Sequence, residues 1–309
     1  MSSLQIIQEF DPWKSKLCTC PPKYSLQPYT GCSHRCLYCY ATSYIRTRRT
    51  IPKKDAIGRL IKDLQKIDPK KHINMSTSSD PYTPEEKVYN LTRRILSIIV
   101  SRGFKVLITT KGTLVLRDID IIRRGNVAVM MTITTLDPKL ASIIEPNAPS
   151  PLDRLRTLCE LSRNGVPIGA RIDPIIPHVN DDEEELRELV DELIECGVRH
   201  IVTSTYKAKP DNLKRLIQSF PDIEEKLRHL YIESSQRIGG YRYLKKHMRK
   251  KLLMPVIEQS KKHGISVATC REGFENNVIC DGSQLIPNRI PIRGRRNIRD
   301  FLRTSNHRV

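Results

Sequence analysis

Short runs rich in valine and isoleucine recur along the first two thirds of the chain, and amphipathic stretches lie between them. Apolar residues in those stretches repeat at helical spacing, so the pattern predicts strands and helices in alternation. The predicted strands cover residues 24–28, 72–78, 104–110, 127–134, 168–172 and 201–205, and the predicted helices cover 51–67, 83–102, 114–124, 150–164 and 181–196.

Several helix ends carry their own signals. Thr83, Pro84 and Glu86 predict a capping box with proline in the first turn, and Gly103 predicts where that helix ends. The helix at 181–196 has an acidic first turn, which the helix dipole favours. Strands and helices that alternate in this way are typical of parallel sheets. Periodicity alone allows either a partial barrel or a doubly wound sheet.

The composition changes in the last third of the chain. Residues 241–262 hold eight Lys or Arg against one Glu, with two tyrosines among them, and residues 287–309 hold seven Arg against one Asp. A further strand is predicted at 265–270. We therefore divide the chain into an N-terminal extension (1–24), an α/β unit (25–210) and a basic, mainly helical C-terminal extension (211–309).

Net charge is the clearest global property. The chain carries 53 Lys and Arg against 34 Asp and Glu, which gives a formal net charge of +19 and a sequence pI near 9.7. A charge of this sign and size favours an anionic partner, most directly nucleic acid bound through its phosphates. Basic residues cluster, for instance at 46–54, which supports this interpretation, although a solvated basic surface gives the same composition.

The sequence indicates neither a membrane protein nor a secreted one. It has no run of 18 apolar residues, and its first residues lack the basic and apolar regions of a signal peptide. We expect a cytoplasmic protein in a thiol-reducing compartment. Nine cysteines in 309 residues then favour metal binding or catalysis over disulfides. Cys159 and Cys196 are expected to be buried free thiols.

Three of the cysteines lie close together. Cys32, Cys36 and Cys39 follow a C-x3-C-x2-C pattern, so one tight loop can hold one metal centre. A structural zinc site needs four ligands, with His34 or a distant thiol as the fourth. Iron–sulfur clusters are also usually held by four cysteines, so a set of three leaves one iron open for chemistry.

This triplet, with a tyrosine just before the third cysteine, resembles the signature of the radical S-adenosylmethionine (SAM) superfamily. Further segments are similar, in order, to its spore photoproduct lyase-like branch, which is related to DNA repair photolyases. The similar segments are YTGCSHRCLYCYA, TSSDPY, TTKGTLVLRDID, EPNAPSPLDRL, DPIIPHVND, CREGF and CDGSQLIP. The resemblance implies an open (β/α)6 barrel of TIM type and a [4Fe–4S] cluster on Cys32, Cys36 and Cys39, whose fourth iron binds SAM.

The resemblance also implies which polar residues face SAM. They lie at the C-terminal ends of predicted strands, where barrel enzymes keep their sites, and they are Ser78, Ser79, Asp80, Thr132, Thr134, Arg171 and Asp173. Arg171 suits the SAM carboxylate, because a guanidinium pairs with a carboxylate through two hydrogen bonds. A surface salt bridge of Arg171 and a turn stabilised by Asp80 are the alternative interpretations.

Two tyrosines and two cysteines are the candidate catalytic residues. Tyr38 and Tyr40 match tyrosines that flank the last cluster cysteine in spore photoproduct lyases. Those enzymes use a cysteine near the end of the second strand as hydrogen donor, and residues 76–82 contain none. Cys270 and Cys280 are therefore the candidates for that role, with ordinary buried thiols as the alternative.

The pair Cys18 and Cys20 leaves two interpretations open. Both can be ordinary thiols of the N-terminal extension. Together with Cys270 and Cys280 they can instead hold a second metal centre, which folding must then assemble from distant segments.

We therefore expect an enzyme that reductively cleaves SAM to a 5′-deoxyadenosyl radical and acts on DNA or RNA, as a repair lyase or a base modifier. Its expected partners are nucleic acid and an electron-donor protein such as a ferredoxin or flavodoxin. Two alternatives remain open. One is a nucleic-acid-binding protein with a structural metal site, and the other is a radical SAM enzyme that modifies a protein.

Overall fold

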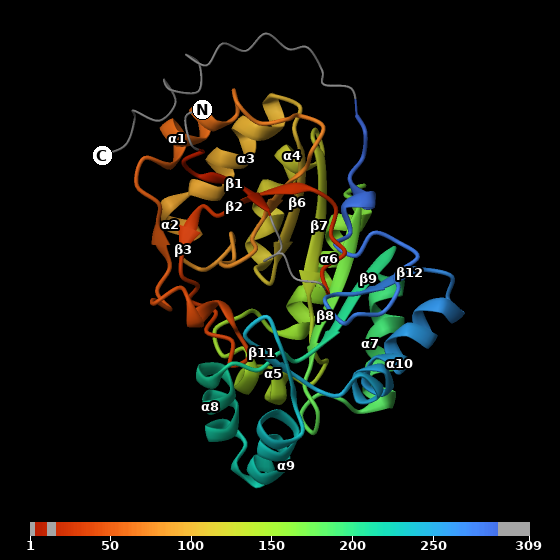
Figure 1. Cartoon of the computed structure of the whole chain (residues 1–309). Coiled ribbons are helices and arrows are strands. Elements are labelled where there is room, and N and C mark those ends of the chain that lie inside the picture. The colour runs from red at the N-terminus through yellow and green to blue at the C-terminus, as the bar shows by residue number, and fades with distance from the viewer. Residues whose placement is uncertain (1–3, 11–16, 290–309) are drawn as a thin grey trace.

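The computed structural model describes residues 4–10 and 17–289 (Figure 1). Most of the arginine-rich segment that we expect to contact an anionic partner, from residue 290 onward, lies outside the described residues. The described part is built on an eight-stranded sheet with the strand order β1-β2-β5-β6-β7-β8-β9-β12.

All strands of this sheet are parallel except β1, which runs antiparallel to β2. The strands are β1 (Ile7–Phe10), β2 (Lys23–Leu26), β5 (Ile73–Met75), β6 (Lys105–Thr110), β7 (Asn126–Thr132), β8 (Ile168–Ile175), β9 (His200–Thr205) and β12 (Ser266–Thr269). The six predicted strands and the further strand predicted at 265–270 are confirmed. Two antiparallel strand pairs lie outside the sheet, namely β3 (Tyr29–Thr30) with β4 (Ile51–Pro52) and the hairpin of β10 (Gln236–Ile238) with β11 (Tyr241–Tyr243).

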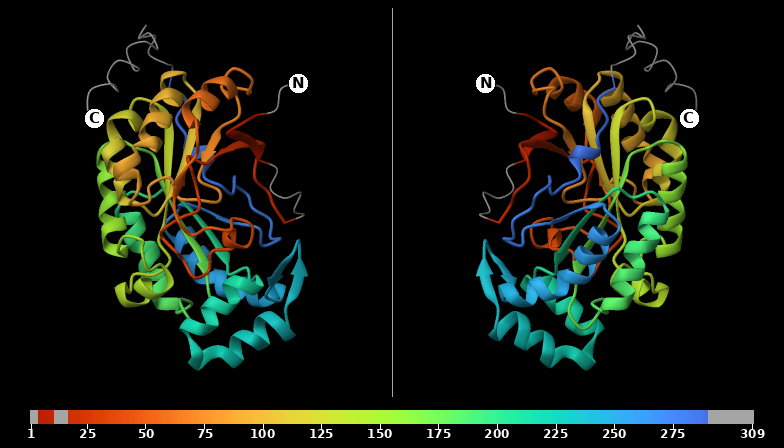
Figure 2. Two further views of the ribbon diagram at one scale, coloured as in Figure 1. Left: turned by 90° about the vertical axis from the view of Figure 1, so that its left-hand side faces the viewer. Right: turned by 90° about the vertical axis from the view of Figure 1, so that its right-hand side faces the viewer.

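Helices connect the strands and cover the outer face of the curved sheet (Figure 2). They are α1 (Ala56–Asp63), α2 (Glu86–Tyr89), α3 (Leu91–Ser101), α4 (Ile119–Ile122), α5 (Pro138–Ile144), α6 (Pro151–Arg163), α7 (Glu183–Glu195), α8 (Pro210–Ser219), α9 (Glu224–Arg228) and α10 (Lys246–Lys262). The central strands follow one another in sequence order, without the reversal of a doubly wound sheet. The partial barrel is therefore confirmed, and it stays open between β1 and β12.

Alternate residues along β7 show how the sheet separates the core from an internal space. Val127, Val129 and Met131 pack with the helices in the main hydrophobic core. Ala128 and Met130 face inward and pack with residues of β6, β9 and the segment after β12. This inward cluster fills part of the barrel interior, and polar side chains line the interior at the C-terminal ends of the strands.

The predicted capping box at the start of the second helical segment is wrong. Glu86 does not reach back to Thr83. Its buried carboxylate accepts hydrogen bonds at 2.9 and 3.2 Å from backbone N–H groups in the first turn of α3. Tyr29 and Arg117 also bind this carboxylate, so tertiary contacts draw it inward. Asn90, with a left-handed φ of 50°, separates α2 from α3.

Two other predicted helices are shorter than their apolar pattern. The segment predicted as a helix at 114–124 forms a 3-10 turn (Thr113–Asp118) followed by α4. Asp118 ends the turn with a buried carboxylate that binds Arg93 and Tyr82. The helix predicted at 51–67 begins only at Ala56, because the residues before it pair with β3.

Cys159 and Cys196 form a disulfide, so the prediction that both are free thiols is wrong. Cys159 belongs to α6 and Cys196 directly follows α7. These two helices pack against each other, which brings the two Cα atoms to 4.3 Å. A sequence separation of 37 residues gives no sign of this contact.

One buried side chain caps the start of the edge strand β1. The carboxylate of Asp63, the last residue of α1, accepts hydrogen bonds from the backbone N–H groups of Gln5, Ile6 and Ile7 at 2.7 to 3.0 Å. Asp63 is fully buried. Its hydrogen bonds tie the first helix to the edge of the sheet.

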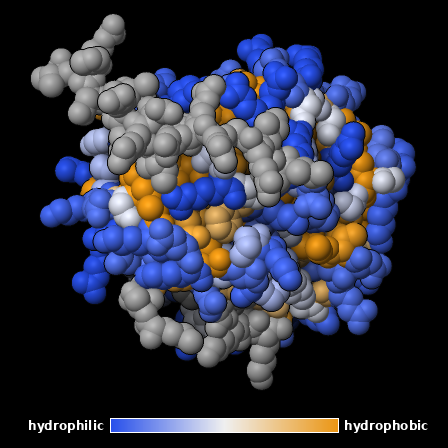
Figure 3. All heavy atoms as spheres, turned by 90° about the horizontal axis from the view of Figure 1, so that it is seen from above, coloured by the Kyte–Doolittle hydropathy of each residue, from blue (hydrophilic) through white to orange (hydrophobic). Residues whose placement is uncertain are grey.

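Seen from above, hydrophilic side chains cover most of the surface, and hydrophobic ones form smaller patches between them (Figure 3). Within 4–10 and 17–289, no helix combines the length and the hydrophobicity that crossing a membrane requires.

Candidate active site

The three predicted cluster cysteines lie on one loop between β3 and a short 3-10 turn (Ala41–Ser43). Gly31 precedes them with a φ of 76°, and a Cβ there would lie 2.2 Å from the carbonyl oxygen of Arg49. Cys36 is buried, and Cys32 and Cys39 are partly exposed. Burial raises the pKa of the Cys36 thiol to about 12, so a metal bound there replaces a proton.

Helix α8 holds this loop by its backbone. Arg215 donates from Nε to the carbonyl oxygen of Leu37 at 3.2 Å, and from Nη2 to that of Cys39 at 2.9 Å. Asn212 donates from Nδ2 to the carbonyl oxygen of Tyr38 at 3.0 Å. One helix thus binds three successive carbonyl groups, which fixes the path of the loop.

A buried ionic network lies behind the loop. The hydroxyl of Tyr38 donates to Glu145, whose carboxylate pairs with Arg154 at 2.5 Å and lies 3.9 Å from the Lys111 ammonium. Burial alone would raise the pKa of the Glu145 carboxyl, but Arg154 and Lys111 hold it below its usual range. Thr134 donates to the same carboxylate at 3.2 Å. Thr134 therefore belongs to this network and not to the cavity wall.

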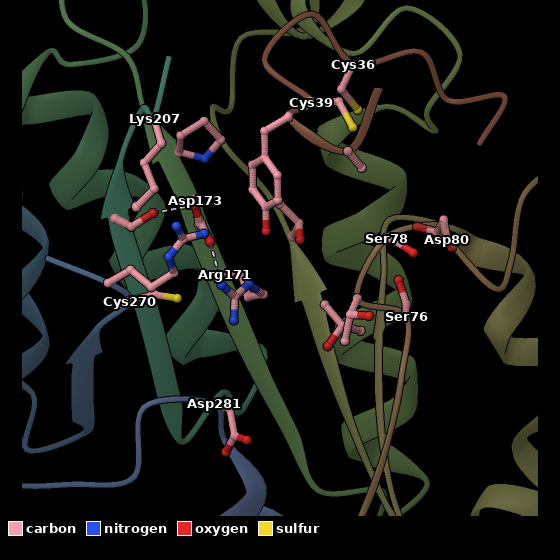
Figure 4. Close-up of a pocket in the computed structure, with 18 of the residues that line it drawn as sticks. Cys36, Cys39, Ser76, Ser78, Asp80, Arg171, Asp173, Lys207, Cys270 and Asp281 are labelled. Atoms are coloured by element: carbon pink, nitrogen blue, oxygen red, sulfur yellow. Dashed lines mark hydrogen bonds and ion pairs between the residues drawn. The ribbon is translucent and has the colours of Figure 1, made fainter. Parts of the chain in front are cut away.

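A cavity of about 280 Å³ lies at the C-terminal ends of the strands (Figure 4). All predicted site residues except Thr134 line it. In Figure 4, Cys36 and Cys39 enter from the cluster loop, Ser76, Ser78 and Asp80 lie along one side, and Arg171, Asp173, Lys207 and Cys270 lie along the other. The fold thus gathers residues from distant parts of the chain around one internal space.

The loop after β5 is held by side chains that were predicted to bind SAM. The Asp80 carboxylate accepts hydrogen bonds from Thr110 Oγ1 at 2.6 Å and from the backbone N–H of Lys111 at 2.7 Å. It also accepts one from the backbone N–H of Tyr82 at 2.8 Å, which is the turn given above as the alternative for Asp80. Ser79 donates to a backbone carbonyl of β3 at 2.9 Å. Asp80 and Ser79 therefore shape the wall beside Ser78.

Strand β8 places Arg171 and Asp173 on the same inward face, two residues apart. Their side chains form an ion pair inside the cavity, so Arg171 does not form a surface salt bridge. Burial alone would raise the pKa of the Asp173 carboxyl, but Arg171 and Lys207 lower it. Thr132, at the end of the neighbouring β7, lies in the same wall. Cationic and anionic groups thus face the space together.

Tyr40 belongs to an aromatic corner of the cavity. Its ring packs edge-on against Tyr241 of β11, with the ring centroids 5.6 Å apart. The Arg271 guanidinium and the Lys209 ammonium each lie 4.5 Å from the centre of the Tyr241 ring. Such cation–π contacts fix the hairpin β10–β11 beside the site.

The remaining two candidate catalytic residues are cysteines that lie close to two further thiols. Cys270 and Cys280 line the cavity together with Cys18 and Cys20. The sulfur of Cys280 lies 3.5 Å from that of Cys20. Cys18 contacts Cys20, and the Cys270 thiol contacts the Arg171 guanidinium.

The loop fits a [4Fe–4S] cluster by the chemistry of its donors. It offers three thiols, and Nε2 of the buried His34 beside them has no hydrogen-bond partner among the described residues, whereas Nδ1 lies 3.5 Å from the Asp80 carboxylate. Across the described ranges, no three His, Cys, Asp or Glu side chains surround one point as a single metal ion needs. A four-iron cluster does not need this arrangement, because each cysteine binds a different iron.

Sequence reasoning missed several groups of this site. Lys111, Glu145 and Arg154 lie in segments whose resemblance was noted, but no pattern gave them a function. Arg215 and Asn212 lie beyond any motif, and only the packing of α8 on the loop reveals them.

Comparison with known proteins supports a single family. Residues 26–190, more than half of the chain, match the Radical SAM superfamily. An uncharacterized protein of Methanocaldococcus jannaschii is 38% identical over 172 residues, which are 52% of this chain and 63% of that protein. The chain thus spans less than two thirds of that relative's length. The Radical SAM Nα-GlyT isomerase of Pseudomonas phage M6 is 22% identical over 259 residues, 80% of this chain and 53% of that protein.

A solved structure shares the fold over most of its length. A spore photoproduct lyase mutant with bound AdoMet and dinucleoside spore photoproduct has a TM-score of 0.62 at 19% identity, and the match covers 84% of this chain and 79% of that chain. The fold predicted from the resemblance is therefore confirmed. On the match over residues 26–190, the chain belongs to the Radical SAM superfamily of enzymes.

Proposed function

We propose that this enzyme binds a [4Fe–4S] cluster through Cys32, Cys36 and Cys39, cleaves SAM, and directs the resulting 5′-deoxyadenosyl radical at a nucleic acid. One observation carries the proposal. The loop with the three thiols forms one wall of a cavity whose other walls are polar strand ends. Thiolates for iron and polar groups for SAM thus meet at the end of the barrel where such enzymes keep their sites.

A cluster held by Cys32, Cys36 and Cys39 would supply the electron for SAM cleavage. The residues of the chain position the reactants. The hydrogen bonds from Arg215 and Asn212 hold the cysteine loop at a fixed place above the strand ends. The Arg171–Asp173 pair offers a cation to the SAM carboxylate and an anion to its amino group. Burial of these groups keeps water away from a reactive radical.

Charge and comparison together support nucleic acid as the substrate class. Arg46, Arg49 and Lys54 are exposed on the segment that follows the cysteine loop. A smaller hollow next to Cys32 is lined by Arg35 and Arg48. Guanidinium groups of this kind bind phosphates well. The spore photoproduct lyase that shares the fold holds a dinucleoside.

The test is an anaerobic assay of SAM cleavage. The protein is reconstituted with iron and sulfide, reduced with dithionite, and assayed for 5′-deoxyadenosine with duplex DNA, irradiated DNA or tRNA. We expect product that increases several-fold with one nucleic acid, and none from Cys36→Ala. Product in Cys36→Ala, or none from cluster-loaded wild-type protein under any of these conditions, would overturn the proposal. Product that none of the nucleic acids increases would overturn its nucleic-acid part.

The nucleic-acid contact has its own matched pair of variants. Arg46→Glu with Arg49→Glu reverses two charges beside the cysteine loop. Arg156→Glu with Arg163→Glu reverses two exposed charges on α6, on the outer helical layer. We expect binding of the substrate nucleic acid to weaken at least tenfold in the first variant and to change little in the second. Equal weakening in both would show a nonspecific charge effect.

A further inference from the structure

Four cysteines outside the cluster loop come together where the two ends of the described chain meet. Cys18 and Cys20 precede β2, whereas Cys270 follows β12 and Cys280 lies ten residues further on. Cys20 and Cys280 are 260 residues apart in the sequence, yet their sulfurs lie 3.5 Å apart. All four line the cavity that the cluster loop also lines.

The two segments that carry these cysteines are docked by contacts of their own. The buried Lys23 ammonium pairs with Asp281 at 2.6 Å, and Asn276 donates to the hydroxyl of Thr19 at 3.3 Å. Leu17 packs on Gly273. Both views of Figure 2 show the N-terminal segment beside the C-terminal one. The proximity of the thiols therefore does not depend on one sulfur–sulfur contact.

We propose that Cys18, Cys20, Cys270 and Cys280 hold a second iron–sulfur cluster, separate from the one on the cluster loop. Four soft thiolates in one place select zinc or iron–sulfur chemistry among biological metals. Zinc needs its ligands around one point, and the described residues contain no such set. A four-iron cluster needs thiolates that each reach a different iron. The Cys20 and Cys280 sulfurs, which lie 3.5 Å apart, would have to move apart for each to bind a different iron.

The surroundings also suit an anionic cluster. Four thiolates around a [4Fe–4S] core leave a net negative charge, which is costly to bury without cations nearby. Lys23 contacts the Cys20 sulfur, and Arg171 contacts that of Cys270. Lys207 adds a third buried cation close to Cys270. These cations also pair with carboxylates, so they stay charged in the folded protein.

Metal counting on variants tests this proposal without any activity assay. In the first variant Cys32, Cys36 and Cys39 are all changed to alanine, which removes the cluster loop as a ligand set. We expect this protein to retain about four iron and four sulfide per chain, with the electron paramagnetic resonance signal of a reduced [4Fe–4S] cluster. Wild-type protein should hold about eight of each.

The second variant, Cys18→Ser with Cys20→Ser, should lose about half of the wild-type iron. Cys159→Ala with Cys196→Ala is the matched control, since it also removes two cysteines and should keep all the iron. Iron is counted on the non-aggregated fraction of each variant after gel filtration, with circular dichroism to confirm its helices. Loss of all iron from the first variant, zinc in place of iron, or unchanged iron in the second variant would overturn the proposal.

The result is independent of the proposed function. A first variant that keeps its iron while wild-type protein fails to cleave SAM would leave the second cluster standing and refute the function. The reverse outcome, SAM cleavage with a single cluster, would refute only the second centre.

Discussion

The two groups of cysteines line one cavity, but the chain brings each together in a different way. Cys32, Cys36 and Cys39 are neighbours in sequence, and helix α8 and a buried ionic network only fix the path of their loop. Cys20 and Cys280 are 260 residues apart in the sequence, with most of the barrel strands between them, and tertiary contacts alone bring them together. A site made by local spacing can be recognised before folding, whereas a site made by tertiary contact cannot.

The largest expected effect is on the network behind the cluster loop. Glu145→Gln leaves the buried Arg154 without its anionic partner, and we expect the free energy of unfolding to fall by about 3–5 kcal/mol. Urea unfolding measures it. Glu160→Gln is the control, because Glu160 pairs with Arg163 at 3.8 Å on an exposed helix face and should cost less than about 1 kcal/mol. An equal loss of unfolding free energy in the two variants would mean that the buried network stabilises the protein no more than an exposed ion pair does.

Glu145→Gln should also change how the stability of the protein depends on pH. Arg154 and Lys111 hold the pKa of Glu145 below its usual range in the folded protein, although burial opposes them. Its stabilising contribution is therefore complete above the unfolded pKa of about 4.3 and is lost as the pH falls through the folded value. The gap in stability between wild-type protein and Glu145→Gln should be widest near neutral pH and narrow below about pH 4. A gap that widens in acid would contradict the assignment.

A smaller effect should distinguish iron bound to the cluster loop from iron bound to the other four cysteines. Arg215→Ala removes the hydrogen bonds to the carbonyl groups of Leu37 and Cys39, at an expected cost of about 1–3 kcal/mol. Iron on the cluster loop should then exchange faster with a chelator, while iron held by Cys18, Cys20, Cys270 and Cys280 should not. Arg228→Ala, on the exposed face of α9, is the control. Faster release from both sites would show general loosening.

The smallest effect concerns the junction of the two chain segments. Thr19→Val removes the hydrogen bond from Asn276 and the contact of the Thr19 hydroxyl with the Cys280 thiol, and it should lower the free energy of unfolding by about 1 kcal/mol or less. Limited proteolysis near residue 19 should nevertheless become faster, because the segment loses one of the contacts that dock it against the loop of Asn276. Asn276→Ala removes the same bond and three more between Asn276 and Thr269 at the end of β12, so it should cost more. A larger loss of unfolding free energy in Thr19→Val than in Asn276→Ala would contradict the described contacts.

Short-range patterns in the sequence were sufficient to predict the alternating strands and helices and the loop with three cysteines, whereas the choice of a partial barrel over a doubly wound sheet came from the resemblance. Six strands and the cysteine spacing could be recognised without any tertiary contact. Glu86 shows where this fails: its position fits a capping box, but Tyr29 and Arg117 draw its carboxylate into the core. The Cys159–Cys196 disulfide and the α8 clamp arise from helix packing, which no local pattern encodes.

Asp63 has a consequence for the behaviour of the protein in concentrated solution. A sheet that stays open presents an edge strand, and unpaired backbone donors on such an edge invite a strand from another molecule. The Asp63 carboxylate already takes three successive N–H groups where β1 begins. That end of the edge therefore offers an incoming strand no free donors, and intermolecular sheet extension is blocked there without closing the barrel.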